Sequence, residues 1–172
     1  MTRTDINALF RPMGLPLIGE GLMMLSCLIP SLHFHDHMWQ PILYSGLFTG
    51  LIGLLLHISI PRQHSSTDRR IPYLVVLAIW MSLSFFGVLP FLTTGVLTRV
   101  SDAFFESMSG IASTGATIFP DVEHLPPSIL LWRSLSQWFG GFGIVLFVLA
   151  IVPSLGINKF SLYTAEVSGA DN

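Results

Sequence analysis

Long apolar stretches joined by short polar links make up most of the chain. A helix that crosses a bilayer needs about 20 consecutive, mostly apolar residues. Four stretches meet this requirement, at residues 13–32, 39–60, 71–92 and 128–158. Glu20 interrupts the first, and the last carries Arg133 near its start and is long enough to predict tilt or a kink near Pro153. The pattern predicts an all-α membrane protein.

A more polar stretch at residues 104–119 separates the third and fourth apolar stretches and is too short to cross a membrane itself. Segments of about 10–14 residues with this character are typical of re-entrant structure. Ser101 and Asp102 are suitable N-cap residues for a short helix that runs to about Ala112. Because non-helical backbone at membrane depth must be buried in protein or line a water-filled path, the pattern predicts a helix–pore loop–helix unit.

The loop after this short helix has the chemistry to bind a dehydrated cation. A helix C-terminus carries about half a negative elementary charge, which favours a cation. Gly115 lacks a Cβ and can adopt backbone angles that turn carbonyl oxygens toward an axis. The carbonyl groups expected to replace the water shell of the ion are those of Ser113, Thr114, Gly115 and Ala116. A buried structural turn explains the same residues, so two interpretations stay open at this point.

Composition agrees with a membrane protein. Apolar residues make up 51% of the chain and charged residues 10%, against about 25% charged residues in soluble domains. The net charge of −2 and the lack of a basic run argue against a nucleic-acid partner. The lone Cys27 leaves the redox compartment undetermined. The first apolar stretch is longer than the apolar region of a signal peptide, which predicts a retained helix.

Basic residues set the expected orientation. Six of the eight Lys and Arg residues fall on one side if the amino terminus is cytoplasmic, namely Arg3, Arg11, Arg62, Arg69, Arg70 and Lys159. Both termini are then expected in the cytoplasm. The expected organisation is a cytoplasmic segment at 1–12, two leading helices with a cytoplasmic link at 13–70, the pore unit at 71–158 and a cytoplasmic segment at 159–172.

Several motifs resemble the first pore unit of the bacterial Trk/Ktr potassium-uptake subunits, in the Trk branch with two extra leading helices. They are DAFFESMSG at 102–110, STGAT at 113–117, LP at 125–126, WRSLSQWFGGFGI at 132–144 and LYTAE at 162–166. The resemblance implies a potassium-uptake subunit of the bacterial inner membrane, with potassium as the transported ion and no organic cofactor. It places the filter of this unit on Ser113, Thr114, Gly115 and Ala116, with Ser113 where Thr is more usual.

The resemblance also implies partners beyond the lipid bilayer. Members of this family hold four non-identical pore units around a pseudo-fourfold axis, and this chain has one. We therefore expect an amino-terminal portion of a longer protein or a truncated product, whose loop is covered by the remaining pore units or by further copies of the chain. A cytoplasmic nucleotide-binding regulatory subunit and a homodimer of full-length chains are also implied. The alternative is a truncated or accessory membrane protein without transport activity.

Other residues have a structural interpretation beside a functional one. Metal-type ligands occur together at His33, His35, Asp36 and His37, where a solvated outer loop is the default. Glu20 is expected to pack against another helix, with a role in ion movement as the alternative. Small residues expected to allow close helix contact are Gly46, Gly50, Gly53, Gly140, Gly141 and Gly143.

Two polar side chains in the pore unit leave further alternatives. Arg133 is expected either to anchor the outer end of its helix or to pair with Glu106. Ser109 and His124 raise the alternative of a membrane hydrolase, but no Gly-x-Ser-x-Gly elbow surrounds Ser109. The sequence therefore favours a protein that is not an enzyme.

Overall fold

The computed structural model describes residues 3–61 and 71–151. Every regular element within these ranges is an α-helix, which confirms the expected fold class. The helices are α1 (Arg3–Ser26), α2 (Leu28–His33), α3 (Trp39–Ser59), α4 (Ile71–Phe86), α5 (Leu89–Thr93), α6 (Val100–Ile111) and α7 (Pro127–Ile151). The expected kink near Pro153 lies outside the described residues.

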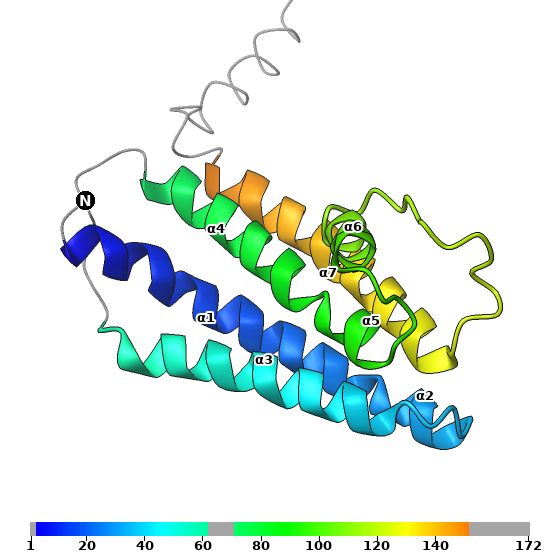
Figure 1. Cartoon of the computed structure of the whole chain (residues 1–172). Helices are drawn as coiled ribbons and strands as arrows, with labels where there is room; N and C mark the ends of the chain where they lie inside the picture. The colour runs from blue at the N-terminus through cyan, green and yellow to red at the C-terminus, as the bar shows by residue number, and fades with distance from the viewer. Residues whose placement is uncertain (1–2, 62–70, 152–172) are drawn as a thin grey trace, which may run out of the picture.

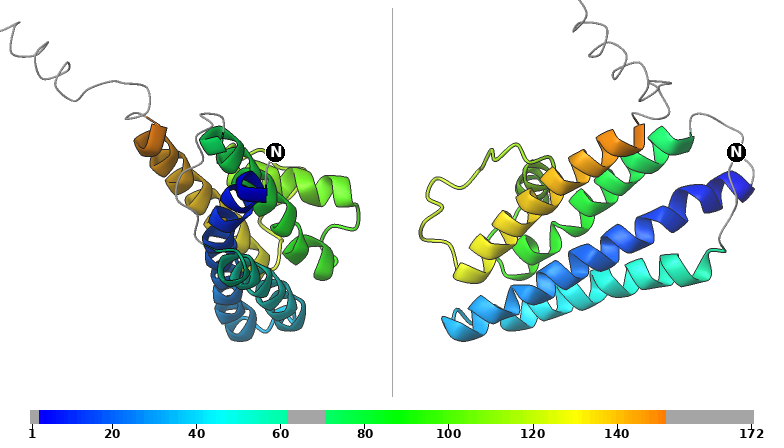
Figure 2. Two further views of the ribbon diagram at one scale, coloured as in Figure 1. Left: turned by 90° about the vertical axis from the view of Figure 1, so that its left-hand side faces the viewer. Right: turned by 180° about the vertical axis from the view of Figure 1, so that it is seen from behind.

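The axes of the long helices α1, α3, α4 and α7 are roughly parallel, with α3 and α7 running opposite to α1 and α4, and the short helix α6 lies across them (Figure 1). Figure 2 shows the same bundle from two further sides, with α3 alongside α1. The link between α2 and α3, the helix α6 and the start of α7 lie toward one end of the bundle. The end of α3, the start of α4 and the end of α7 lie toward the other. This arrangement places the loop after α6 on the same side as the link between the leading helices.

Three helical stretches within the described residues are long and apolar enough to cross a membrane, at Leu9–His33, Trp39–Ser59 and Tyr73–Thr93. They correspond to the first three apolar stretches of the sequence. The 25-residue helix α7 covers the described part of the fourth.

Two of the expected spans are broken by a short interruption. The first divides into α1 and α2, and the third divides into α4 and α5, where a single helix was expected to reach residue 92. A proline has no N–H to bond the carbonyl four residues earlier. Pro30 and Pro90 leave the carbonyls of Ser26 and Phe86 without that bond, and these are the residues at which α1 and α4 end. Two further prolines lie inside α1 without ending it.

Glycines bring α1 and α3 into close contact. A Cβ added at Gly21 would lie 2.7 Å from the backbone nitrogen of Gly50 and 2.8 Å from the carbonyl oxygen of Gly46. A Cβ added at Gly14 would lie 2.7 Å from the carbonyl oxygen of Gly53. The predicted small-residue face of α3 is therefore confirmed, and α1 supplies a matching face that the sequence analysis missed. Gly50 takes part in this contact through its backbone atoms. A Cβ added at Gly50 itself would meet no other atom, so this position does not require a glycine.

A buried cluster joins the leading helices to the pore unit. Trp132 of α7 and Phe91 of α5 are each 1% exposed and pack with Met24 of α1 and Ile42 of α3. The indole Nε1 of Trp132 donates a hydrogen bond to the carbonyl of Gly87, 3.3 Å away, at the break between α4 and α5. This cluster fixes α7 against the leading helices.

Candidate functional site

The short helix α6 begins earlier than the sequence suggested. Its N-cap position is Arg99, whose backbone is extended and whose side chain makes no capping hydrogen bond. The predicted capping by Ser101 and Asp102 is therefore wrong. Both residues lie in the first turn, and the Ser101 hydroxyl donates to the Asp102 carboxylate at 3.1 Å. Asp102 still favours this end electrostatically, because a negative charge near a helix N-terminus is stabilising. The C-terminal end agrees with the prediction, with Ala112 at the C-cap.

The C-terminal end of α6 rests directly on α7. A Cβ added at Gly140 would overlap the carbonyl oxygen of Ile111, so only glycine allows this approach. A Cβ added at Gly141 would lie 3.5 Å from the Ser113 hydroxyl, an ordinary contact distance. The predicted role beside the short helix is confirmed for Gly140, whereas the space at Gly141 does not require a glycine. Gly143 differs, since it faces Trp80 of α4.

The chain reverses direction after α6 through two residues in the left-handed region. Ser113 has φ 53° and Gly115 has φ 74°. The angle at Gly115 agrees with the conformational freedom predicted for it. Ser113 was not expected there, because a left-handed conformation costs an L-residue about 1–2 kcal/mol. The Ser113 hydroxyl donates to the carbonyl of Gln137 on α7 at 2.8 Å, and this bond helps to hold the conformation.

Side chains of α6 form hydrogen bonds to the part of the loop that follows Gly115. The Ser109 hydroxyl donates to the carbonyl of Ala116 at 2.6 Å. One oxygen of Glu106 accepts hydrogen bonds from the Thr117 hydroxyl at 2.6 Å and from the backbone N–H of Ile118 at 2.5 Å. These contacts fasten the segment to one side of its own unit. The sequence analysis did not predict these contacts, because they join residues whose spacing follows no helical or strand period.

Glu106 and Arg133 form an ion pair behind the loop. The side chain of Glu106 is 1% exposed and that of Arg133 is 11% exposed. The Arg133 guanidinium also lies over the ring of Phe119, 5.4 Å from its centroid, a distance that suits a cation–π contact. Of the two alternatives predicted for Arg133, the structure shows the ion pair with Glu106.

The opposite face of the loop is open. Ser113, Thr114, Gly115 and Ala116 are all exposed. Beside them, Trp138 and Phe142 of α7 stack in parallel with centroids 6.0 Å apart and are 67% and 52% exposed. A groove runs between the loop and this face, lined by Ser113, Ser134, Gln137, Trp138, Gly141, Phe142 and Val145. The loop is therefore tethered on one side and accessible on the other.

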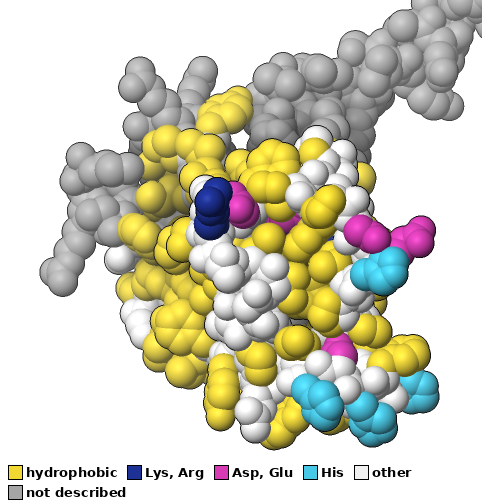
Figure 3. Space-filling view, turned by 45° about the vertical axis from the view of Figure 1, so that its right-hand side comes forward, with side chains coloured by type: hydrophobic (Ala, Val, Ile, Leu, Met, Phe, Trp, Pro, Cys, Tyr) yellow, Lys and Arg dark blue, Asp and Glu magenta, His cyan; other side chains and the backbone are white. Residues whose placement is uncertain are grey.

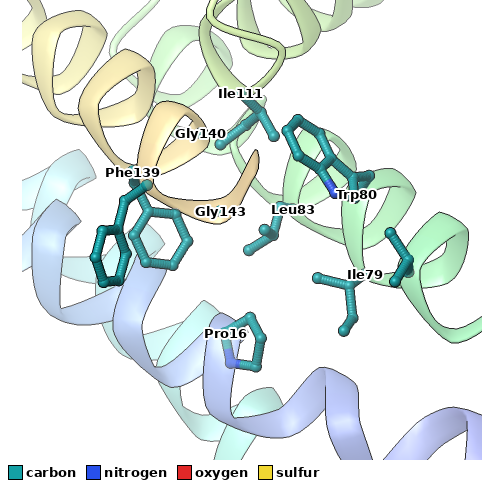
Figure 4. Close-up of a pocket in the computed structure, with 10 residues that line it drawn as sticks. Pro16, Ile79, Trp80, Leu83, Ile111, Phe139, Gly140 and Gly143 are labelled. Atoms are coloured by element: carbon teal, nitrogen blue, oxygen red, sulfur yellow. The ribbon is translucent and has the colours of Figure 1, made fainter. Parts of the chain in front are cut away.

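An apolar cavity of about 280 Å³ lies on the other side of the α6–α7 contact (Figure 4). Its labelled lining includes Trp80 and Leu83 of α4, Phe139 of α7 and Pro16 of α1. Ile111 and Gly140 lie at its upper edge in the figure. An apolar cavity of this kind does not hold a cation, because it offers almost no oxygen ligand.

The remaining candidates take other contacts. The hydroxyl of Ser109 is engaged with the loop, whereas His124 pairs with Asp121 at 2.6 Å on an exposed surface. The structure thus offers no support for a hydrolase centre built on Ser109 and His124. Histidine side chains gather at one edge of the molecule (Figure 3), and those of the link between α2 and α3 are exposed. Within the described ranges, no group of three or more His, Cys, Asp or Glu side chains is arranged to hold a metal ion.

Comparison with known proteins gives consistent matches. The family model "TrkH: Cation transport protein" matches residues 40–171. The Trk system potassium uptake protein TrkH of Halomonas elongata is 36% identical over 168 residues, and that of Escherichia coli K12 is 34% identical over 165 residues. An uncharacterized cation transporter of Methanocaldococcus jannaschii is 31% identical over 168 residues.

A solved structure shares the fold. The crystal structure of the potassium transporter TrkH from Vibrio parahaemolyticus superposes with a TM-score of 0.81 at 32% identity, covering 96% of this chain and 36% of that one. The sequence matches to Halomonas elongata and Escherichia coli cover 96% and 95% of this chain and 34% of each relative. The chain therefore spans about a third of the length of the relatives that it matches.

Proposed function

Since this chain belongs to the TrkH family of cation transport proteins, we propose that it forms part of a pathway for potassium uptake across the bacterial inner membrane. In this proposal it contributes one of the four loops that together make a selectivity filter. The ion is the transported substrate, and the chain performs no covalent chemistry. The printed names of its relatives describe potassium uptake, and the helical fold of the chain is that of a membrane transporter.

The filter residues of the proposal are Ser113, Thr114, Gly115 and Ala116. The observation that carries this assignment is the one-sided tethering of the loop. Hydrogen bonds that join it to α6 and to α7 hold its back, while the four residues themselves stay exposed. A polar backbone segment with a free face needs a water-filled path or protein on that side, because lipid cannot satisfy its hydrogen bonds.

Electrostatics supports a cation at this place. The C-terminal end of α6 leads into the loop, and a helix C-terminus carries partial negative charge. Arg133 lies close by, but Glu106 neutralises it from within the same unit. The backbone carbonyls of the exposed loop are then the proposed ligands, that of Ala116 also accepting from Ser109, and rings of carbonyl oxygens are what potassium filters use to replace the hydration shell.

We further propose the partners that such a loop requires. Remaining pore units, or further copies of the chain, would cover the open face around Trp138 and Phe142. The proposed topology has both termini in the cytoplasm, where a nucleotide-binding regulatory subunit would meet a homodimer of full-length chains.

Potassium uptake in a strain that lacks its own uptake systems tests the proposal. The gene at its native length should restore growth on low potassium, and the 172-residue chain alone should not, because one loop is a quarter of a filter. A native-length protein that reaches the membrane at normal levels without restoring uptake would contradict potassium transport. Rescue by the 172-residue chain as a cross-linked tetramer would instead replace the single-loop proposal with a homotetramer.

A further inference from the structure

Glu20 is a buried acidic residue for which the pore loop gives no role. It lies within the Leu9–His33 span and is 0% exposed. Neither carboxyl oxygen has a hydrogen-bond partner among the described residues. Most buried polar atoms in proteins are hydrogen-bonded, so an acid in this condition needs a physical explanation.

No cationic side chain is available to pair with it in the described part of the chain. On the helices packed against α1, the titratable or charged side chains are the exposed His33 of α2, Tyr44 and His57 of α3, Tyr73 of α4 and Arg133 of α7. Both tyrosines are exposed, and Arg133 pairs with Glu106 of α6. His57 contacts Gly14, which lies about 9 Å from Glu20 along α1 at 1.5 Å per residue.

The charged groups elsewhere on α1 and on α6 are also engaged or distant. Arg11 of α1 donates to the carbonyl of Ile60 at the end of α3. Asp102 of α6 is near the start of that helix, and Glu106 is committed to the loop and to Arg133. An ionised Glu20 would therefore stand uncompensated at membrane depth, which is strongly unfavourable.

The atoms that surround Glu20 are hydrogen-bond acceptors. The position that a Cβ of Gly87 would occupy is 3.0 Å from Glu20 Oε1 and 2.9 Å from the carbonyl oxygen of Leu83. The same position overlaps the Ser107 hydroxyl oxygen. Ser107 already donates its proton to the carbonyl of Ser84 at 2.7 Å, so only its lone pairs remain. A carboxylate would repel both oxygens, whereas a carboxylic acid can donate to a free lone pair of Ser107 or to the second lone pair of the Leu83 carbonyl, which already accepts from the N–H of Gly87 at 2.8 Å.

We propose that Glu20 is a proton-binding site inside the membrane, whose neutral acid O–H group donates to the acceptors at the break between α4 and α5. The bound proton links the leading helix α1 to the break at Gly87 and to the helix α6, whose Ser107 is already hydrogen-bonded to Ser84 of α4. Glu20 is thus a positioning residue for the helix that carries the loop. The proposal does not depend on which ion the protein transports.

Infrared spectroscopy of the full chain in lipid bilayers tests the proton directly. At neutral pH we expect a carbonyl stretching band of a protonated carboxylic acid, and this band should disappear in Glu20→Gln. Glu123→Gln, which changes an exposed glutamate of the loop, is the matched control and should leave the band unchanged. A spectrum in which Glu20→Gln removes only carboxylate absorption would overturn the proposal.

The hydrogen bond has its own test. Ser107→Ala removes one acceptor and should shift the acid band toward the frequency of a less strongly bonded carbonyl. Ser101→Ala, which changes an exposed serine of the same helix, should not shift it. Glu20→Gln keeps an N–H donor and should unfold at the wild-type temperature, whereas Glu20→Leu should unfold at a lower one. Equal losses in Glu20→Gln and Glu20→Leu, or no shift in Ser107→Ala, would contradict the donor role.

Discussion

Asp36 and Ser128 lie 92 positions apart, yet one oxygen of the Asp36 carboxylate accepts hydrogen bonds from both the backbone N–H and the hydroxyl of Ser128. The two distances are 3.2 Å and 2.5 Å. The other oxygen accepts from the backbone N–H of Met38 at 3.0 Å and from the Ser31 hydroxyl. The first turn of a helix has N–H groups without partners in the helix. The link between α2 and α3 therefore supplies a cap to α7.

Removing this cap should weaken the contact between the leading helices and the pore unit. We expect Asp36→Ala to lower the free energy of unfolding by about 1 kcal/mol, the usual cost of losing an N-cap side chain. Thermal unfolding in detergent, followed by tryptophan fluorescence, measures the change. Asp121→Ala is a suitable control, because Asp121 contacts only its loop neighbours Glu123 and His124 on an exposed part of the loop. Equal stability of Asp36→Ala and the wild type would show that the cap contributes nothing.

The same carboxylate predicts an acid dependence. Burial acts to raise the pKa of Asp36, but hydrogen bonds from Ser128, Ser31 and Met38 outweigh it and lower the pKa below its usual value of 3.8. The folded state thus favours the ionised form. Its contribution to stability is complete above about pH 3.8 and is lost as the pH falls from there through the folded pKa. We expect Asp36→Asn to flatten this part of the curve of unfolding temperature against pH, and an unchanged curve would exclude Asp36 as its source.

The sequence predicted the spans and the re-entrant helix because their signals are local. The apolar length of a span and the turn at Gly115 can each be recognised within one continuous segment. The same holds for the effect of proline on the carbonyl four residues earlier, which explains the breaks after Ser26 and Phe86. Applied to Pro30 and Pro90, that rule would have found both breaks. The start of α6 was wrong because Ser101 was suitable for a cap that an extended Arg99 occupies instead.

The contacts that hold the site were not predictable in the same way. Glu106 reaches Thr117 and Ile118 across the loop, and Asp36 reaches Ser128 across most of the chain. Such pairs depend on how helices meet in three dimensions, and no period in the sequence records them. The pairing of Glu106 with Arg133 was one of two open alternatives because both residues were known to lie near the same end.

Breaking the pair between Glu106 and Arg133 should disturb the loop as well as the fold. Arg133→Gln leaves the carboxylate of Glu106 buried without a counter-charge, and loss of one partner of a buried pair costs about 3–5 kcal/mol. Unfolding temperature and membrane yield should both fall. Arg99→Gln, at an exposed arginine, should change neither. The double variant Glu106→Gln with Arg133→Gln should recover part of the loss, and a double variant no better than the single would contradict a charge effect.

Adjacent glycines of α7 offer a matched pair of substitutions. Gly140→Ala places a methyl group on the carbonyl oxygen of Ile111, so α7 must move away from the end of α6. We expect a loss of about 1–3 kcal/mol, the usual cost of overpacking. Gly141→Ala meets only the Ser113 hydroxyl at 3.5 Å and should be tolerated. Unfolding temperatures of the two variants make the comparison, and equal values would mean that α6 and α7 are not so closely packed.

Reporter fusions test the proposed orientation. Six of the eight basic residues favour the side that we assign to the cytoplasm. Fusions near Arg62 and at Asn172 should therefore report a cytoplasmic location, and a fusion at His35 should report an external one. The structure adds that the link at His35 and the start of α7 lie at the same end of the bundle. An external signal at Asn172 would refute the arrangement of α7 as a single spanning helix after a re-entrant loop.

The last prediction separates ion selectivity from backbone strain. Gly115 and Gly95 have nearly the same backbone, with φ 74° and 75°, and a Cβ on either would meet open space. Gly115→Ser and Gly95→Ser should thus carry a similar conformational cost of about 1–2 kcal/mol. Only the first alters the carbonyls of the proposed filter.

In the native-length protein we expect Gly115→Ser to reach the membrane but to lose its preference for potassium over sodium. A difference of about 1.4 kcal/mol in the relative free energy of the two ions at the site is a tenfold change in binding. Ser113→Thr keeps the hydroxyl that donates to Gln137 and should keep the preference for potassium, although a β-branched residue at φ 53° costs stability. Uptake with competing ions at matched expression measures the ratio, and an unchanged ratio in Gly115→Ser, or an equal loss in Gly95→Ser, would remove Gly115 from the filter.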